Sequence, residues 1–148
     1  MKPGTVFKWN NFPYPKFGGK IKARWFIYLG DTGLLSSPII AHLCTTTTTL
    51  EDFKPMGKRA THRFFLFTKV KYPFFDQDCI LDYDEEPYPE EKKSLLTNTS
   101  IEMKGELDNA CLKTIYYGIW KSSSYPPKIV LDIHSSLNQI GIAGLKKP

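Results

Sequence analysis

The sequence lacks the segments that mark a membrane-inserted or exported protein. No apolar stretch approaches the roughly 20 residues that a transmembrane helix needs. The opening residues, Met1 to Thr5, contain no apolar run of the kind found in a signal peptide. We therefore expect a cytoplasmic protein that has no membrane partner.

The sequence is also poor in motifs that hold metals or cofactors. Its three cysteines, Cys44, Cys79 and Cys111, are widely spaced and lie in apolar surroundings, and no Cys/His cluster has the spacing of zinc ligands. There is no glycine-rich phosphate loop, and the acidic residues lack the ligand order and glycine of a calcium loop. We predict buried free thiols, no metal site and no cofactor.

Basic residues are absent from one segment of an otherwise basic chain. Residues 76–91 hold eight of the fifteen acidic residues and no lysine or arginine. The rest of the chain has 20 basic and 7 acidic residues, a net charge of +13. A basic body attracts polyanions, of which nucleic acid is the usual one, although a well-solvated basic protein with no such partner is the alternative.

Length and periodicity predict one domain, residues 1–148, that is mainly β with C-terminal helices, an α+β fold. Apolar, aromatic and β-branched runs predict strands at 6–9, 21–29, 39–44, 63–70, 77–83 and 100–104. Residues 85–93 are charged and contain Pro87 and Pro89, so they predict an exposed loop.

A four-residue period then predicts two amphipathic helices at the end of the chain. The apolar stripe of the first is Leu107, Cys111, Ile115 and Ile119, and that of the second is Ile129, Ile133, Leu137 and Ile140. Ser124 is the expected N-terminal cap of the second helix, and Gly141 its end. We interpret residues 124–148 as a helical extension of the domain.

The candidate phosphate-binding residues lie in or next to two apolar runs. Residues 20–30 include Arg24 near the start of a predicted strand, and residues 39–44 lead into five threonines, Thr45 to Thr49. An arginine that faces a hydroxyl can hold a phosphate, because the guanidinium binds two phosphate oxygens and the hydroxyl donates to a third. A surface arginine paired with a carboxylate and a solvated threonine turn explain the same residues without a site.

Other residues extend this interpretation. Aromatic and basic residues alternate over 8–25, a mixture that suits single-stranded nucleic acid but that core packing and solubility explain equally well. For proton transfer the chain offers His42, which reads as a structural residue, and His62, which reads as a surface residue or a phosphate ligand. The candidate RNA-binding residues are Lys16, Lys20, Lys22, Trp25, Arg59, His62 and Arg63.

The order of these motifs resembles the MazF/PemK/Kid family of toxins over residues 2–122. The chain opens with Lys2-Pro3-Gly4 before a strand, and Lys22-Ala-Arg24-Trp25 is similar to the family's Lys-x-Arg-Pro strand. A strand ending in Thr45-Thr46 follows. Further matches are Phe75-Asp-Gln-Asp78-Cys-Ile-Leu81 and Gly105-Glu-Leu-Asp108, which precedes a helix.

The resemblance implies an SH3-like barrel of about five to seven antiparallel strands with two helices packed on it. It implies an endoribonuclease that cleaves single-stranded RNA without metal, through attack of the 2′-OH on the adjacent phosphate. Arg24 would be catalytic with Thr45 or Thr46, and a homodimer and an antitoxin are the implied protein partners.

The segment from Asp82 to Tyr88 departs from the family, which has a Gln and an Arg there. A catalytically inactive barrel that binds nucleic acid or protein is therefore the alternative. A third possibility is self-inhibition, with the acidic segment folded over the basic groove.

Overall fold

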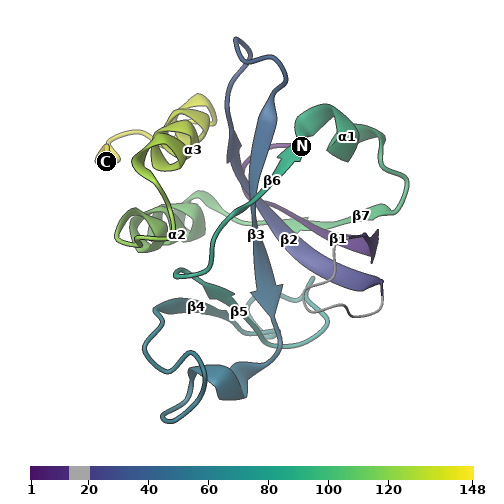
Figure 1. Ribbon diagram of the computed structural model, residues 1–148, viewed down its shortest axis with the longest axis vertical. Coiled ribbons are helices and arrows are strands. Elements are labelled where there is room, and N and C mark those ends of the chain that lie inside the picture. The colour runs from purple at the N-terminus through teal and green to yellow at the C-terminus, as the bar shows by residue number, and fades with distance from the viewer. Residues whose placement is uncertain (14–20) are drawn as a thin grey trace.

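Seven strands form one curled antiparallel sheet in the computed structural model, which describes residues 1–13 and 21–148 (Figure 1). The order is β4-β5-β3-β2-β1-β7, and β6 also pairs with β3. The expected fold class, mainly β with C-terminal helices, is confirmed. The strands are β1 (Thr5–Phe12), β2 (Lys22–Asp31), β3 (Ile40–Thr47), β4 (Phe64–Phe67), β5 (Cys79–Asp82), β6 (Tyr88–Glu91) and β7 (Ile101–Glu106).

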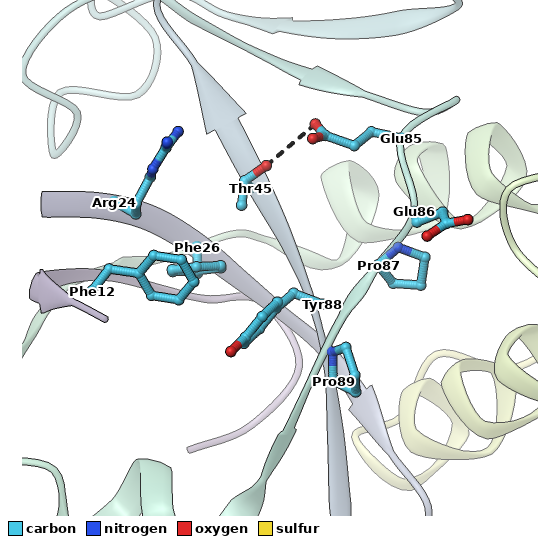
Figure 2. Close-up of a pocket in the computed structure, with 9 residues that line it drawn as sticks. All are labelled: Phe12, Arg24, Phe26, Thr45, Glu85, Glu86, Pro87, Tyr88 and Pro89. Atoms are coloured by element: carbon cyan, nitrogen blue, oxygen red, sulfur yellow. Dashed lines mark hydrogen bonds between the residues drawn. The ribbon is translucent and has the colours of Figure 1, made fainter. Parts of the chain in front are cut away.

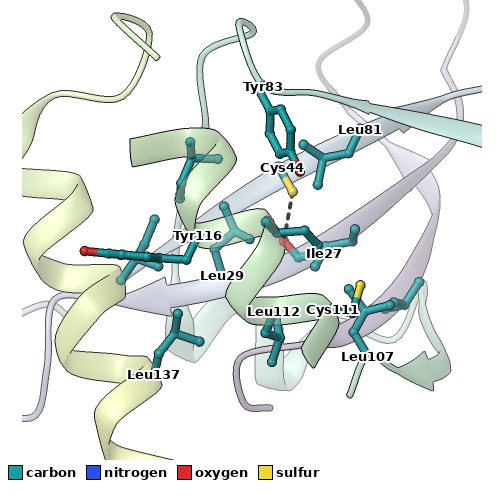
Figure 3. Close-up of a cluster of buried hydrophobic side chains, with 14 of the residues drawn as sticks. Ile27, Leu29, Cys44, Leu81, Tyr83, Leu107, Cys111, Leu112, Tyr116 and Leu137 are labelled. Atoms are coloured by element: carbon teal, nitrogen blue, oxygen red, sulfur yellow. Dashed lines mark hydrogen bonds between the residues drawn. The ribbon is translucent and has the colours of Figure 1, made fainter. Parts of the chain in front are cut away.

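Strand β2 is buried on both faces, which explains its continuous apolar run. Side chains alternate along a strand, so Ile27 and Leu29 enter one cluster while Phe26 and Tyr28 enter another. The first cluster, drawn in Figure 3, lies between the sheet and the C-terminal helices. The second lies on the opposite face and is rich in aromatic rings. These two cores fix which side of the sheet each polar residue of β2 and β3 reaches.

Helices α2 (Asn109–Trp120) and α3 (Pro127–Gln139) lie together on one side of the sheet (Figure 1). Asp108 caps α2 by accepting a hydrogen bond from the backbone N–H of Cys111 at 2.8 Å. The prediction that Ser124 caps α3 is wrong, because its hydroxyl donates instead to the backbone oxygen of Asp84 at 2.7 Å. Residues 124–148 contribute several side chains to the first core, among them Tyr125, Val130, Ile133, Leu137 and Leu145.

The prediction of an exposed loop over residues 85–93 is also wrong. Residues 88–91 form strand β6 against β3, and helix α1 (Lys92–Thr97) starts directly after it. Pro89 lies opposite His42 on this outer strand, where a residue without an N–H costs no ladder hydrogen bond if its nitrogen faces away from the partner. Proline marks an edge strand here rather than a loop.

His42 has a structural position, as its sequence context indicates. Its Nε2 lies 2.9 Å from Oδ2 of Asp132 on α3, and both side chains are largely buried. All three cysteines are buried free thiols, which confirms that prediction. Within the part of the chain that the structure describes, no helix combines the length and apolar character needed to cross a bilayer.

Candidate functional site

Strands β2 and β3 separate from each other at Arg24. Their ladder runs from the Asp31–Ala41 pair to the Phe26–Thr45 pair. Beyond this point β2 pairs with β1, where Arg24 lies opposite Trp9, whereas β3 pairs with β5. The half-buried Arg24 therefore stands where the sheet opens. Among the residues that the structure describes, no carboxylate forms an ion pair with it.

Arg24 lines a first cavity of about 540 Å³, which we call the aromatic pocket. Figure 2 shows Arg24 on one side of it and Thr45 with Glu85 on the other. The hydroxyl of Thr45 donates to Oε2 of Glu85 across 3.4 Å. The other described residues of the lining are three rings, two prolines and a second carboxylate, namely Phe12, Phe26, Tyr88, Pro87, Pro89 and Glu86.

The position of Glu85 follows from how β5 and β6 share one edge of β3. Strand β5 pairs with Thr46 and Thr47, and β6 pairs with residues 40–43. The chain between them leaves the edge of β3 beside Thr45, and this detour carries Glu85 to the rim of the pocket (Figure 2). The Glu85 side chain is 22% exposed, so it lies partly in contact with solvent.

Three aromatic rings form one side of the aromatic pocket. The centroids of Phe12 and Phe26 lie 5.2 Å apart, and the ring of Tyr88 lies 5.3 Å from Phe12 and 5.8 Å from Phe26. Rings at these distances support each other's orientation. Phe26 and Phe12 are buried, so the ring on which a flat apolar ligand group, such as a nucleobase, can stack is the half-buried Tyr88.

Arg24 also lines a second cavity of about 240 Å³, which we call the threonine cleft. One wall is residues 22–25 of β2, and the other is Thr46 to Thr49, with Phe75, Asp76, Gln77 and Cys79 at the end. Thr45 and Thr46 thus reach different cavities, because successive strand residues point to opposite faces. The hydroxyl of Thr46 is also a hydrogen-bond partner of the Cys79 thiol.

The predicted RNA-binding residues fall into separate groups. Lys22 and Trp25 line the threonine cleft beside Arg24. Lys16 and Lys20 lie outside the described residues. The remaining three, Arg59, His62 and Arg63, lie next to the acidic turn that follows β5.

The acids of this turn bind all three of these basic residues. Asp82 Oδ2 lies 2.7 Å from His62 Nδ1 and 3.2 Å from Arg59 Nη1, and the Asp82 side chain is only 1% exposed. Arg59 Nη1 also lies 3.7 Å from Glu85 Oε2. Arg63 lies 3.7 Å from Asp84 and donates to the backbone oxygen of Gly118 at 2.8 Å. Three of the eight acids of residues 76–91 therefore compensate basic charges of the chain itself beside the site.

The thiols near the site are not poised as nucleophiles. Burial raises the pKa of Cys79 to about 11, despite the hydrogen bond from Thr46. Burial also raises the pKa of Cys44 well above its ordinary value. A protonated thiol is a poor nucleophile, so the candidate functional groups are the polar side chains that line the aromatic pocket, Arg24, Thr45, Glu85 and Glu86. Among residues 1–13 and 21–148, no group of His, Cys, Asp and Glu is arranged to hold a metal ion.

Sequence reasoning missed Glu85, Phe12 and Tyr88 as site residues. Glu85 is one of eight acids in a charged stretch, and no spacing rule singles it out. Tyr88 lies between two prolines in a segment that predicted a loop. The pairing of β6 with β3, which brings both to Arg24 and Thr45, is a long-range contact that local patterns do not encode.

Comparison of the chain with protein-family models, with curated proteins and with solved structures finds no match. The similarity to the MazF/PemK/Kid family therefore stays a prediction that rests on the order of motifs along the chain.

Proposed function

We propose that this protein is a toxin-like endoribonuclease that cleaves single-stranded RNA without a metal ion. The observation that carries the proposal is the aromatic pocket, where an arginine with no ion-pair partner among the described residues, a hydroxyl and a carboxylate line one cavity beside a cluster of aromatic rings. Each of these groups matches one requirement of RNA cleavage by the neighbouring 2′-OH.

In the proposed reaction, the base of one nucleotide stacks on Tyr88, whose ring packs on Phe12. Glu85 accepts the proton of that nucleotide's 2′-OH, whose oxygen then attacks the adjacent phosphorus. The bond to the 5′-oxygen of the next nucleotide breaks, that oxygen takes a proton from water, and the resulting hydroxide takes the proton from Glu85, which restores the carboxylate. The products are a 2′,3′-cyclic phosphate and a free 5′-OH.

Arg24 supplies electrostatic stabilisation in this scheme. The phosphorane carries two negative charges, and a planar guanidinium that is always charged binds two of its oxygens. Because no described carboxylate neutralises Arg24, its charge is available to a phosphate. The Thr45 hydroxyl orients Glu85 through their hydrogen bond, or turns to donate to a phosphate oxygen.

The proposal is tested by incubating the protein with single-stranded RNA in EDTA and identifying the product ends. We expect fragments with 2′,3′-cyclic phosphates, and no cleavage of an oligonucleotide with 2′-deoxyribose throughout. A requirement for divalent metal, or equal cleavage of the DNA strand, would contradict it. Thr45→Val should slow cleavage about tenfold, the weight of one hydrogen bond to a charged group. The matched change Thr46→Val, on the other cavity, should slow it less.

A non-catalytic binding module is the second candidate. The observation in its favour is that Arg59, His62 and Arg63 are already bound by Asp82, Asp84 and Glu85, which lowers the positive charge left for RNA. This candidate predicts no cleavage, together with RNA binding that is weak or only slightly dependent on salt.

Two partners belong to the same proposal because the resemblance implies them. Sedimentation of the purified protein tests the homodimer. Co-expression with a small acidic protein encoded next to it tests the antitoxin, which should protect cells from growth arrest. A monomer that arrests growth would leave the cleavage proposal standing and remove the dimer from it.

A further inference from the structure

The threonine cleft has the features of an anion site of its own. The edge of β2 that faces Thr46 to Thr49 has no strand against it among the described residues, since β2 there pairs with β1 alone. Lys22 and Arg24 bring two positive charges to the lining, and the exposed Asp76 brings one negative charge. The exposed Thr48 adds a hydroxyl, and the Thr47 hydroxyl accepts from the backbone N–H of Thr49.

The proposed reaction sets the order in which successive nucleotides of the substrate meet the two cavities. Glu85 lines the aromatic pocket, so the nucleotide whose 2′-OH is deprotonated must place its sugar on that side of Arg24. The leaving 5′-oxygen belongs to the next nucleotide. The cleft adjoins this side of the pocket, because Arg24 lines both cavities, so it offers that nucleotide a place beyond Arg24.

We propose that the threonine cleft is a second phosphate subsite, which binds the phosphate on the 3′ side of the scissile one. Lys22 pairs with this phosphate, and the hydroxyl of Thr48 donates to it. The inference rests on the proposed function, since the order of the cavities depends on which nucleotide reacts. It adds a direction to the substrate and gives the threonine run a role beyond Thr45 and Thr46.

Two isomeric ligands test the subsite directly. Both are dinucleotides with a 2′-O-methyl group, which blocks cleavage, and with one additional terminal phosphate. The phosphate is at the 3′ end in one ligand and at the 5′ end in the other, so their total charges are equal. Binding is measured by calorimetry or by competition with a fluorescent oligonucleotide at fixed salt.

We expect the 3′-phosphate isomer to bind about fivefold more tightly, the weight of one partly exposed charge contact. Lys22→Ala should abolish this preference and leave the affinity for the 5′-phosphate isomer nearly unchanged. Thr48→Val, which removes only a hydroxyl, should reduce the preference. The control Lys113→Ala removes a charge that is also exposed, on α2, and should preserve the preference.

Equal affinities for the two isomers, or tighter binding of the 5′-phosphate isomer, would overturn the subsite. A Lys22→Ala variant that weakens both isomers alike would also overturn it, because Lys22 would then act on the RNA charge in general. If neither ligand binds and Arg24→Ala does not change the rate of RNA cleavage, the proposed function itself would be rejected. The two failures are therefore distinguishable.

Discussion

Replacement of Glu85 by glutamine separates the proposed proton transfer from the size and shape of the side chain. Glutamine keeps the side-chain length and one oxygen that accepts from Thr45, whose hydroxyl lies 3.4 Å from the carboxylate. It loses the ability to take a proton from the 2′-OH. A positioned general base contributes about 10²- to 10⁴-fold to the rate, so we expect the cleavage rate of Glu85→Gln to fall by a factor in this range.

The same change should have small effects on stability and the opposite effect on binding. The ion pair of Glu85 with Arg59 is long, at 3.7 Å, and both side chains are partly exposed, so its loss should cost less than about 1 kcal/mol. Removal of a negative charge from the pocket rim should tighten RNA binding about two- to fivefold, because less repulsion opposes the phosphates. Cleavage and affinity should thus move in opposite directions.

The assay is single-turnover cleavage of a fluorogenic RNA in EDTA, with binding of an uncleavable 2′-O-methyl analogue measured in parallel. A melting curve of each variant controls for folding. An unchanged cleavage rate would remove Glu85 from the mechanism. A faster rate would show that the carboxylate obstructs the phosphate site, as the self-inhibition hypothesis requires.

Two further predictions concern the framework that positions the site. Burial opposes ionisation of Asp31, but hydrogen bonds from Tyr28, Lys92 and the Gly33 N–H outweigh it and hold its pKa below the usual range. Its stabilising contribution is therefore present at neutral pH and is lost as the pH falls through this lowered pKa. In urea titrations Asp31→Asn should cost about 2 kcal/mol at pH 7 and much less near pH 2, and an equal cost at both would contradict the reasoning. Gly118→Ala should destabilise the protein by about 2 kcal/mol despite alanine's higher helix propensity, since the added Cβ would lie 2.1 Å from the Tyr83 ring. In a Tyr83→Ala background the same change should be neutral or stabilising, and a persistent penalty there would exclude the steric cause.

The sequence predicted the parts of the fold that local periodicity encodes. The alternating and continuous apolar runs located β1, β2 and β3, and the four-residue stripes located α2 and α3. Strand β6 escaped prediction because its pairing with β3 compensates for two nearby prolines that locally indicate a loop. Ser124 was misjudged for a similar reason, as its hydroxyl satisfies a distant backbone oxygen.

The candidate site likewise combines residues that local sequence patterns predict with contacts that only the three-dimensional fold determines. Arg24 and the threonines stand out in the sequence because a charged residue and a run of hydroxyls flank apolar strands. Their assignment to different cavities depends on the register Phe26–Thr45, and the contribution of Glu85 depends on the course of the chain between β5 and β6. Neither feature has a local signal. The ion pairs of Arg59, His62 and Arg63 with the acidic turn are likewise visible only in three dimensions.

The central claim is that Arg24 stabilises the transition state of RNA cleavage. It is tested most directly by the cleavage rate of Arg24→Ala in EDTA, beside Arg24→Lys, which keeps the charge without the bidentate geometry. We expect a loss of about 10²- to 10³-fold for alanine and a partial loss for lysine, with unchanged melting temperatures. Cleavage by Arg24→Ala at the wild-type rate would contradict the account.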